Sequence, residues 1–312
     1  MATKDHQSEP IESASETLQR IFDGHGSVLG SQMADESSRY DVLKKTDFPK
    51  PQRTRRIAVA NQKGGVGKTT STVNTAAALA NKGAQVLVID MDPQGNASTA
   101  LGVSHASGEP SVYDVIEGRS DLGDVITVCP DFPTLDVVPA SIDLSGAELE
   151  VADLPNRNTL LKEALDLYLR QSDKHYDYVF IDCPPSLGLL VINAMCAVTE
   201  MLIPIQAEYY ALEGLSQLIH TIELVQERLN PELEIEGVVF TMYDARTNLS
   251  LQVVENVKDN LNQNIYKTII PRNVRLAEAP SYGMPINLYD PKSKGTESYL
   301  LLAEEVINKG EE

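Results

Sequence analysis

The chain has 312 residues, 42% of them hydrophobic, which is enough for one large α/β domain with additional segments. Its net charge is −19 and its sequence pI is near 4.6, which argues against nucleic-acid binding by the chain as a whole, so any DNA contact needs a local basic patch. No apolar run approaches the roughly 18 residues of a membrane span, and the chain starts with the polar segment MATKDHQSEP, so we predict a cytoplasmic protein without direct membrane insertion. The three cysteines are scattered and form no CxxC pair, so neither a disulfide framework nor a cysteine metal site is expected.

Residues 1–54 differ in composition from the rest of the chain. They are rich in Ser, Asp, Glu and Gln, their charges nearly balance, and no strand pattern appears, so we predict a largely disordered N-terminal tail. Apolar residues at helical spacing occur at Ile11, Ala14, Leu18, Ile21 and Phe22. This spacing predicts a short amphipathic helix that docks on a partner or on the domain itself, although a transient helix without a role fits it equally. Its polar face lacks the Lys and Arg excess of a membrane helix.

From residue 55 onward, short apolar runs alternate with helical patterns. Strands are predicted at 57–60, 86–89, 135–139, 178–181, 201–205, 237–242 and 267–270. Helices are predicted at 69–82, 158–171, 212–229, 250–262 and 298–308, the first of them ending at Gly83. Apolar strands joined by crossover helices imply an α/β fold with a mostly parallel twisted sheet and helices on both faces. No repeat or linker divides residues 55–312, which we therefore predict to be one domain.

A glycine-rich segment, NQKGGVGKTT, lies between the first predicted strand and the first predicted helix. Its glycines let the backbone turn tightly, with N–H groups directed at phosphate oxygens, and the following helix adds its positive N-terminal end. Lys68 is then expected to neutralise the β- and γ-phosphates, Thr69 to ligate magnesium, and Thr70 to lie near the α-phosphate. Gln62 stands where the general pattern G-x-x-x-x-G-K-[ST] has its first glycine, so the strict pattern is not met.

A second lysine, Lys63, lies in the same loop. Two neighbouring ammonium groups repel each other unless an anion lies between them, and a triphosphate supplies that negative charge. If Lys63 does not fold back on its own nucleotide, it can reach the nucleotide of a facing subunit. ATP would then form part of a dimer interface.

Carboxylates follow two of the predicted strands directly. Asp90 and Asp92 come after the strand at 86–89, at the end of the sheet where ligands bind in such folds, although paired aspartates there are also common as helix caps and turn formers. A carboxylate at this place can orient an attacking water or hold the outer shell of magnesium. Asp182 follows the apolar strand YVFI in a Walker B arrangement, which predicts a magnesium contact through water. Pro184 and Pro185 fix the backbone of the next loop.

The segment KGGVGKTT resembles the deviant Walker A loop of the ParA/MinD ATPases, and the similarity extends from about residue 56 to residue 302. The resemblance implies a catalytic set of Lys63, Lys68 and Asp92. In that set, Lys63 is the signature lysine that contacts phosphate across a sandwich dimer, and Asp92 positions the hydrolytic water. Asp90 is expected to be structural, and the loop after Asp182 resembles switch II, which senses the γ-phosphate.

Two distal segments, PIQAEYYALEGLSQL and IPRNVRLAEAPSYGMPI, resemble the chromosome- and plasmid-partitioning branch of this family. By this match, Pro271 and Asn273 lie against adenine, whereas Glu208 and Tyr209 line the nucleotide end of the dimer interface. The full set of residues expected to bind ATP is Lys63, Gly64, Gly65, Val66, Gly67, Lys68, Thr69, Thr70, Pro271 and Asn273.

The same resemblance points to DNA. Arg246 and Arg275 match residues of the family's nonspecific DNA-binding surface, and arginine suits phosphate because its planar donors fit phosphate geometry. Isolated arginines in so acidic a chain are also commonly paired with acids. Binding through these residues is expected to be independent of DNA sequence and steeply dependent on salt.

The function implied by the resemblance is that of a ParA/Soj-type ATPase with ATP and Mg²⁺ as cofactors. ATP closes a homodimer that coats the nucleoid, and a ParB-like centromere-binding partner stimulates hydrolysis and release. Hydrolysis without the partner is expected to be slow, because no built-in arginine finger is evident. The tail is a candidate contact for a polar or membrane-associated scaffold.

Three other functions fit the sequence less well. A MinD-like membrane-associated positioning ATPase needs a basic amphipathic helix at the C-terminus, whereas this chain ends in the acidic ESYLLLAEEVINKGEE. A metal-cluster carrier with the same loop needs paired cysteines. A nucleotide-free scaffold is disfavoured by the presence of Lys68, Thr69, Asp92 and Asp182.

Overall fold

The computed structural model describes residues 39–208, 211–244, 257 and 264–310. The chain divides into two compact units, Met1–Lys45 and Thr46–Glu312. In the first unit, residues 39–43 are helical. The amphipathic helix predicted at residues 11–22 lies outside the described residues, as does most of the helix predicted at 250–262. Within the described ranges, no helix combines the length and the apolarity needed to cross a bilayer.

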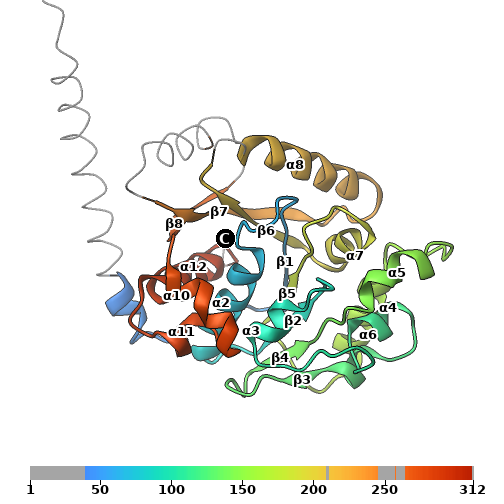
Figure 1. Ribbon diagram of the computed structural model, residues 1–312, viewed down its shortest axis with the longest axis horizontal. Helices are drawn as coiled ribbons and strands as arrows, with labels where there is room; N and C mark the ends of the chain where they lie inside the picture. Colours follow the sequence, from blue (N-terminus) through green and yellow to red (C-terminus); the bar gives the residue numbers. More distant parts are fainter. Residues whose placement is uncertain (1–38, 209–210, 245–256, 258–263, 311–312) are drawn as a thin grey trace, which may run out of the picture. The chain divides into compact units, whose positions relative to one another are not determined.

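The described part of the second unit contains an eight-stranded sheet, whose strand order is β3-β4-β2-β5-β1-β6-β7-β8 (Figure 1). The strands are β1 Arg55–Val59, β2 Val86–Asp90, β3 Thr127–Val128, β4 Leu135–Val138, β5 Tyr178–Asp182, β6 Glu200–Gln206, β7 Glu234–Tyr243 and β8 Ile265–Pro271. Neighbouring strands pair in parallel, with the exception of the antiparallel pair β3–β4. The seven strands predicted from the sequence are therefore confirmed, within a few residues at their ends. Strand β3 was not predicted, because two exposed residues carry no periodic signal.

Helices cover both faces of this sheet. The α-helices are α2 Lys68–Asn81, α3 Asn96–Ala100, α4 Val112–Ile116, α5 Leu144–Glu150, α6 Leu160–Gln171, α7 Leu189–Ala197, α8 Ala211–Arg228, α10 Val274–Glu278, α11 Ile286–Tyr289 and α12 Lys294–Lys309, and two short 3₁₀ turns are η1 Leu122–Val125 and η2 Ala279–Tyr282. Helices α2 and α12 pack together on one side, whereas α6, α7 and α8 form a layer on the other. The longer predicted helices are confirmed, apart from the one at 250–262.

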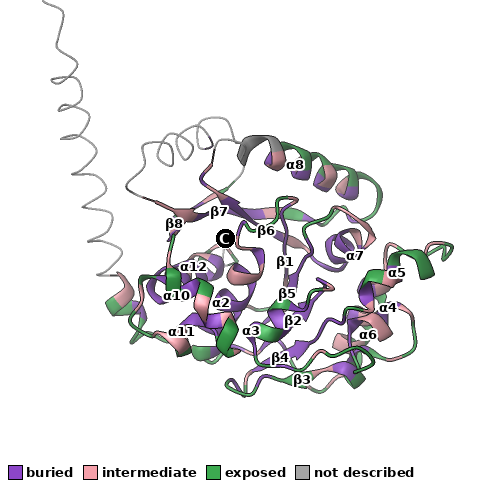
Figure 2. Cartoon of the chain, viewed as in Figure 1, coloured by how far each residue is buried: buried purple, intermediate pink, exposed green. Residues whose placement is uncertain are grey.

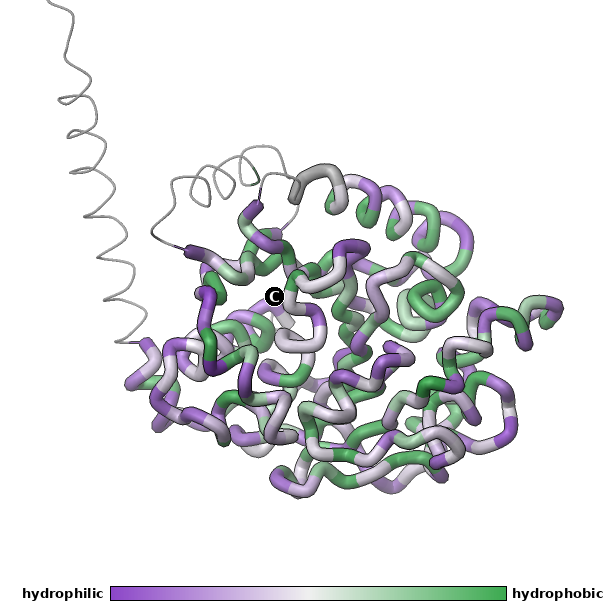
Figure 3. The backbone as a smooth tube through the Cα atoms, viewed as in Figure 1, coloured by the Kyte–Doolittle hydropathy of each residue, from purple (hydrophilic) through white to green (hydrophobic). Residues whose placement is uncertain are grey.

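The core lies in the middle of the sheet. Strands β2 and β5 are buried along their whole length, as expected for parallel strands covered on both faces. Figure 2 shows this burial in the central strands, and Figure 3 shows that hydrophobic residues concentrate there. Helix α2 is buried over most of its length and ends as predicted, because Gly83 adopts the left-handed φ of 84° that terminates helices.

Candidate functional site

The site begins with the register of the three central strands. Val59 of β1 lies opposite Asp182 of β5, which in turn lies opposite Asp90 of β2. The strand ends that carry the glycine-rich loop and both aspartates are thus neighbours. Ligands bind at this end of a parallel sheet because loops diverge there on the two sides of a central strand. The register therefore gathers residues that are far apart in the sequence.

The glycine-rich loop wraps the start of helix α2. Gly65 and Gly67 have φ values of 74° and 87°, a conformation that glycine adopts without strain. Gly67 is also the residue that precedes the helix, and no side chain caps the first backbone N–H groups there. Those groups and the helix dipole form an anion-binding end of the helix.

Asp182 lies beside the hydroxyl groups of the first turn of α2. Thr69 Oγ1 donates a hydrogen bond to one carboxylate oxygen at 2.7 Å, and Thr72 Oγ1 donates to the other at 3.0 Å. The carboxyl is fully buried. Burial raises its pKa, the nearby Asp90 raises it further, and the threonine hydrogen bonds oppose the shift. A hard cation next to this carboxylate would remove the cost of the buried charge.

The cationic side of the site is Lys68. Its side chain is largely buried, and its Nζ donates to the backbone oxygen of Lys63 at 3.3 Å. Burial lowers its pKa, whereas the acidic groups of Asp182 and Asp92 oppose this effect. Lys68 is thus close to Asp182, the carboxylate expected to hold magnesium, and a bound phosphate would add the negative charge that the buried ammonium group requires.

Asp90 holds the loop that carries Asp92. Its carboxylate accepts hydrogen bonds from the backbone N–H of Asp92 at 3.1 Å and from both the N–H and the hydroxyl of Ser98 at 2.8 Å. Asp92 in turn accepts from the N–H of Gln94 at 3.0 Å and borders the cleft. Asp90 therefore organises the loop, and Asp92 is the carboxylate that faces the cleft.

Lys63 does not line the cleft of its own chain in this structure. Its Nζ lies 2.7 Å from Glu208 Oε2, and both side chains are partly exposed. Glu208 is held in turn by Gln206 Nε2, which donates to its other oxygen at 2.6 Å. The backbone N–H of Lys63 donates to Asn61 Oδ1 at 2.9 Å. Tyr209, expected next to Glu208, lies outside the described residues.

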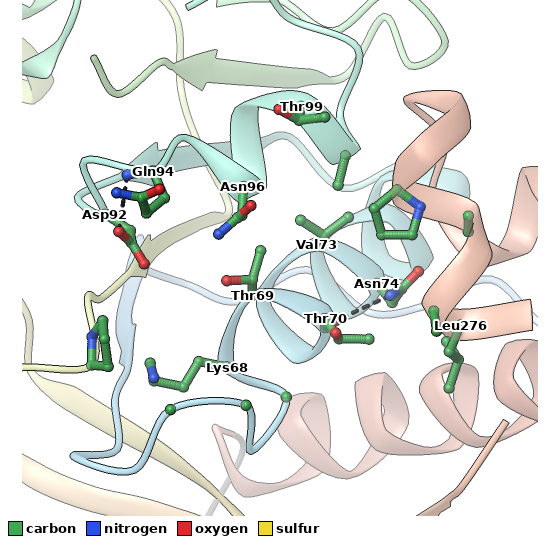
Figure 4. A pocket seen from close by; sticks show the side chains of 18 of the residues that line it. Lys68, Thr69, Thr70, Val73, Asn74, Asp92, Gln94, Asn96, Thr99 and Leu276 are labelled. Atoms are coloured by element: carbon green, nitrogen blue, oxygen red, sulfur yellow. Dashed lines mark hydrogen bonds between the residues drawn. The ribbon is translucent and has the colours of Figure 1, made fainter. Parts of the chain in front are cut away.

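A cleft of about 480 Å³ opens over the loop and along helix α2. Figure 4 shows Lys68 and Asp92 on one side of it and Leu276 on the other. Its lining residues include Gly64, Gly65, Gly67, Lys68, Thr69, Thr70, Asn74, Asp92 and Leu276. Val66, the remaining predicted residue of the loop, is buried and does not line the cleft. The predicted phosphate-binding residues, except Lys63 and Val66, thus border one cavity.

An adjoining cavity of about 350 Å³ shares Gly67 and Thr70 with the cleft. Pro271 and Asn273 line it, so the structure brings the two residues expected near adenine next to the glycine-rich loop. The side-chain oxygen of Asn273 also accepts a hydrogen bond from the N–H of Arg275 and thereby caps helix α10. Sequence reasoning missed Met242, which borders both cavities, because nothing in the spacing marks it.

The two arginines expected to bind DNA have different outcomes. Arg246 lies outside the described residues. Arg275 is exposed, and its guanidinium lies 3.0 Å from Glu278 and 3.7 Å from Asp290. Two acids therefore offset its charge in the isolated chain.

The cysteines and histidines of the described ranges form no second site. Cys129, Cys183 and Cys196 are free and buried. In the part of the chain that the structure describes, no group of three His, Cys, Asp or Glu side chains is placed to hold a metal. Within the described residues, the candidate chemistry is thus found at the loop, the strand-end carboxylates and the two adjoining cavities.

Comparisons with known proteins agree with this arrangement. A family model described as an AAA domain matches residues 54–235. The chain is 55% identical over 254 residues to the sporulation initiation inhibitor protein Soj of Bacillus subtilis, which covers 81% of this chain and 98% of that protein. It is 49% identical over 253 residues to the chromosome partitioning protein ParA of Caulobacter vibrioides, which covers 81% and 94%.

Solved structures share the fold. A cobyrinic acid a,c-diamide synthase from Mycobacterium smegmatis with bound ADP and magnesium superposes with a TM-score of 0.69 at 36% identity, covering 80% of this chain and 93% of that one. The septum site-determining protein MinD of Pyrococcus horikoshii complexed with Mg-ADP gives 0.68 at 28%, covering 81% and 96%. Together with the matches to Soj and ParA and the geometry of the loop, these similarities show that the chain belongs to the Soj/ParA family of chromosome-partitioning proteins, within the P-loop ATPases of the ParA/MinD type.

Proposed function

We propose that this protein is an ATP-dependent switch for DNA partitioning, in which ATP closes a homodimer that binds DNA non-specifically and a ParB-like partner triggers hydrolysis. The observation that carries the proposal is the different placement of the two lysine side chains of the loop. Lys68 lines the cleft together with Asp92, whereas Lys63 does not line that cleft and pairs with Glu208. A lysine that does not contact the nucleotide of its own chain is free to contact the nucleotide bound to a facing subunit.

ATP and Mg²⁺ fit the residues present. The Thr69 hydroxyl and the Asp182 carboxylate are adjacent, and they offer the oxygen ligands that magnesium prefers, with Asp182 acting through water. When bound, magnesium would neutralise charge that develops on the phosphates. The loop N–H groups and Lys68 would hold the phosphates, and Asp92 would orient the attacking water.

The proposed dimerisation links nucleotide state to assembly. The Lys63 ammonium would exchange the Glu208 carboxylate for a phosphate of the facing subunit, so the dimer would form only when a triphosphate is present. After hydrolysis the γ-phosphate is lost, and Glu208 would recapture the lysine. This exchange makes ATP the condition for closure, as in other γ-phosphate switches.

DNA binding is proposed through Arg246 and Arg275. The chain carries a net charge of −19, so contact with a phosphate backbone has to be local, and closing a dimer would double the number of arginines that act together. In this proposal the protein is cytoplasmic and nucleoid-associated, and its N-terminal tail contacts a polar or membrane-associated scaffold. Hydrolysis is slow until the ParB-like partner binds.

The MinD-like membrane alternative is less well supported. It requires an amphipathic C-terminal helix with a free apolar face. In this structure the apolar residues of α12, among them Tyr299, Leu302 and Val306, are buried against the domain. That face therefore stabilises the fold and is not available to a bilayer.

The test of the proposed function is DNA retention with ATP, with ADP and without nucleotide, in parallel with light scattering for the dimer. The proposal expects retention and dimerisation with ATP alone. Equal retention in all three states, or ATP-dependent pelleting with liposomes in place of DNA, would overturn it.

A further inference from the structure

The end of strand β7 contains a backbone distortion that the proposed chemistry leaves unused. Among the described residues, Met242 is the only non-glycine residue with a positive φ, at 52°. L-residues rarely adopt this conformation, and such residues cluster at ligand clamps and active sites.

The register of β7 and β8 shows the form of the distortion. Phe240 pairs with Ile269 and Tyr243 pairs with Pro271, so three steps along β7 match two steps along β8. One extra residue is therefore inserted in β7, which is a β-bulge. Bulges redirect a side chain while pairing continues beyond them. Here pairing does continue, because the N–H of Arg272 donates to the oxygen of Tyr243 at 2.9 Å.

The residue before the bulge is fixed to the phosphate loop. Thr241 Oγ1 lies 2.7 Å from the backbone oxygen of Val66 and 3.1 Å from that of Ile205. Its methyl group lies 3.6 Å from the position that a Cβ on Gly67 would occupy. Thr241 thus fixes the end of β7 to the glycine-rich loop, and the bulge begins at the next residue.

Met242 consequently lies at the junction of the two cavities. It borders both the 480 Å³ cleft over the phosphate loop and the 350 Å³ cavity that contains Pro271 and Asn273. Its side chain is half-buried, so part of its surface faces the cavities. A thioether is polarizable and packs well on aromatic rings.

We infer that Met242 is a positioning residue for the nucleoside. The bulge holds its thioether at the junction of the two cavities, where it packs on the base or ribose. This contact fixes the orientation of the nucleoside relative to the bound phosphates. This inference rests on the proposed function, because it assumes that a nucleoside triphosphate occupies the cleft. Met242 itself would take no part in bond breaking.

The experiment measures binding of Mg-ATP and of Mg-tripolyphosphate to the full chain by calorimetry. Tripolyphosphate reports on the phosphate loop without a nucleoside. Three variants separate side chain from backbone: Met242→Gly removes the thioether and relieves the positive φ, Met242→Asn tolerates that φ but is polar, and Met242→Leu keeps the apolar bulk. Thermal denaturation of each variant checks that the fold is retained.

The expected result is a loss of ATP affinity of about tenfold in Met242→Gly and Met242→Asn, with unchanged tripolyphosphate affinity and near-normal ATP binding in Met242→Leu. Unchanged ATP affinity in the Gly and Asn variants would overturn the inference, as would an equal loss for both ligands. If the unmodified chain binds neither ligand, the proposed function itself fails. These failures are therefore distinguishable.

Discussion

The ammonium of Lys63 and the carboxylate of Glu208 lie 2.7 Å apart within a single chain, and neither residue lines the cleft over the glycine-rich loop. Both side chains are more than one third exposed, at 41% and 46%, so water screens the attraction and the pair is weak. A weak pair is suited to exchange, because a phosphate can replace the carboxylate at little cost. The contact orients the lysine and does not stabilise the fold appreciably.

Glu208→Gln should therefore favour the ATP dimer. The neutral amide no longer competes for the lysine, so we expect half-maximal dimerisation at a several-fold lower ATP concentration, measured by light scattering, with the melting temperature almost unchanged. Lys63→Ala is the companion variant and should abolish the dimer while ATP binding remains. If Glu208→Gln required as much ATP as the unmodified chain, the exchange of partners would be wrong.

Asp92→Ala should bind ATP and accumulate as a dimer. Asp92 faces the cleft but lies outside the Thr69–Asp182 pair. Its loss should therefore lower the rate of hydrolysis by about 100-fold or more without removing the phosphate or magnesium contacts. Light scattering at saturating ATP and phosphate release measure the two effects. Lys68→Ala is the control and should lose ATP binding. A monomeric Asp92→Ala protein at saturating ATP, or full ATPase activity in Lys68→Ala, would contradict the assignments.

Arg275 is predicted to contact DNA once it is released from its acidic neighbours. Arg275→Glu should lose ATP-dependent DNA retention but still dimerise, whereas Glu278→Gln should raise DNA affinity because one of the competing carboxylates disappears. The salt dependence of binding provides the measurement, with a shallower slope expected when a phosphate contact is removed. Unchanged retention in Arg275→Glu would remove this residue from the DNA surface.

Glu236 should make stability depend on pH. Its side chain is only 4% exposed, one carboxylate oxygen lies 3.5 Å from Arg55, and the other has no hydrogen-bond partner within the described residues. Burial raises its pKa to about 8, although Lys309 and Arg55 oppose the shift. Between the ordinary glutamate value, about 4.3, and this raised value the folded state binds more protons than the unfolded state, so the free energy of unfolding falls as pH rises, by at most about 1.4 kcal/mol per pH unit.

Glu236→Gln removes that proton-linked contribution. Thermal denaturation between pH 5 and pH 9 should therefore show a smaller decline in melting temperature for the variant, which becomes the more stable protein at the alkaline end. If the melting temperatures of the two proteins changed with pH in the same way over this range, Glu236 would be ionised in the folded protein at neutral pH.

The sequence was most informative where local geometry dictates residue type. The turn around Gly67 and the helix end at Gly83 were predictable because both need a left-handed backbone, and Asp182 was predictable because it follows a four-residue apolar run. The pairing of Lys63 with Glu208 was not, since it joins residues 145 positions apart in the chain. The bulge at Met242 was also unpredictable, because it arises from the pairing of two strands and leaves no compositional signal.

The hydrogen bond from Thr241 to Val66 has a consequence for biosynthesis. The glycine-rich loop is among the first parts of the domain to leave the ribosome. Thr241, whose hydroxyl donates a hydrogen bond to this loop, follows Val66 by 175 positions. A partly synthesised chain that ends before β7 would carry the whole glycine-rich motif and still lack the support that shapes it. Nucleotide capture would then begin only after β7 has been translated, although the glycine-rich motif itself is complete about 170 residues earlier.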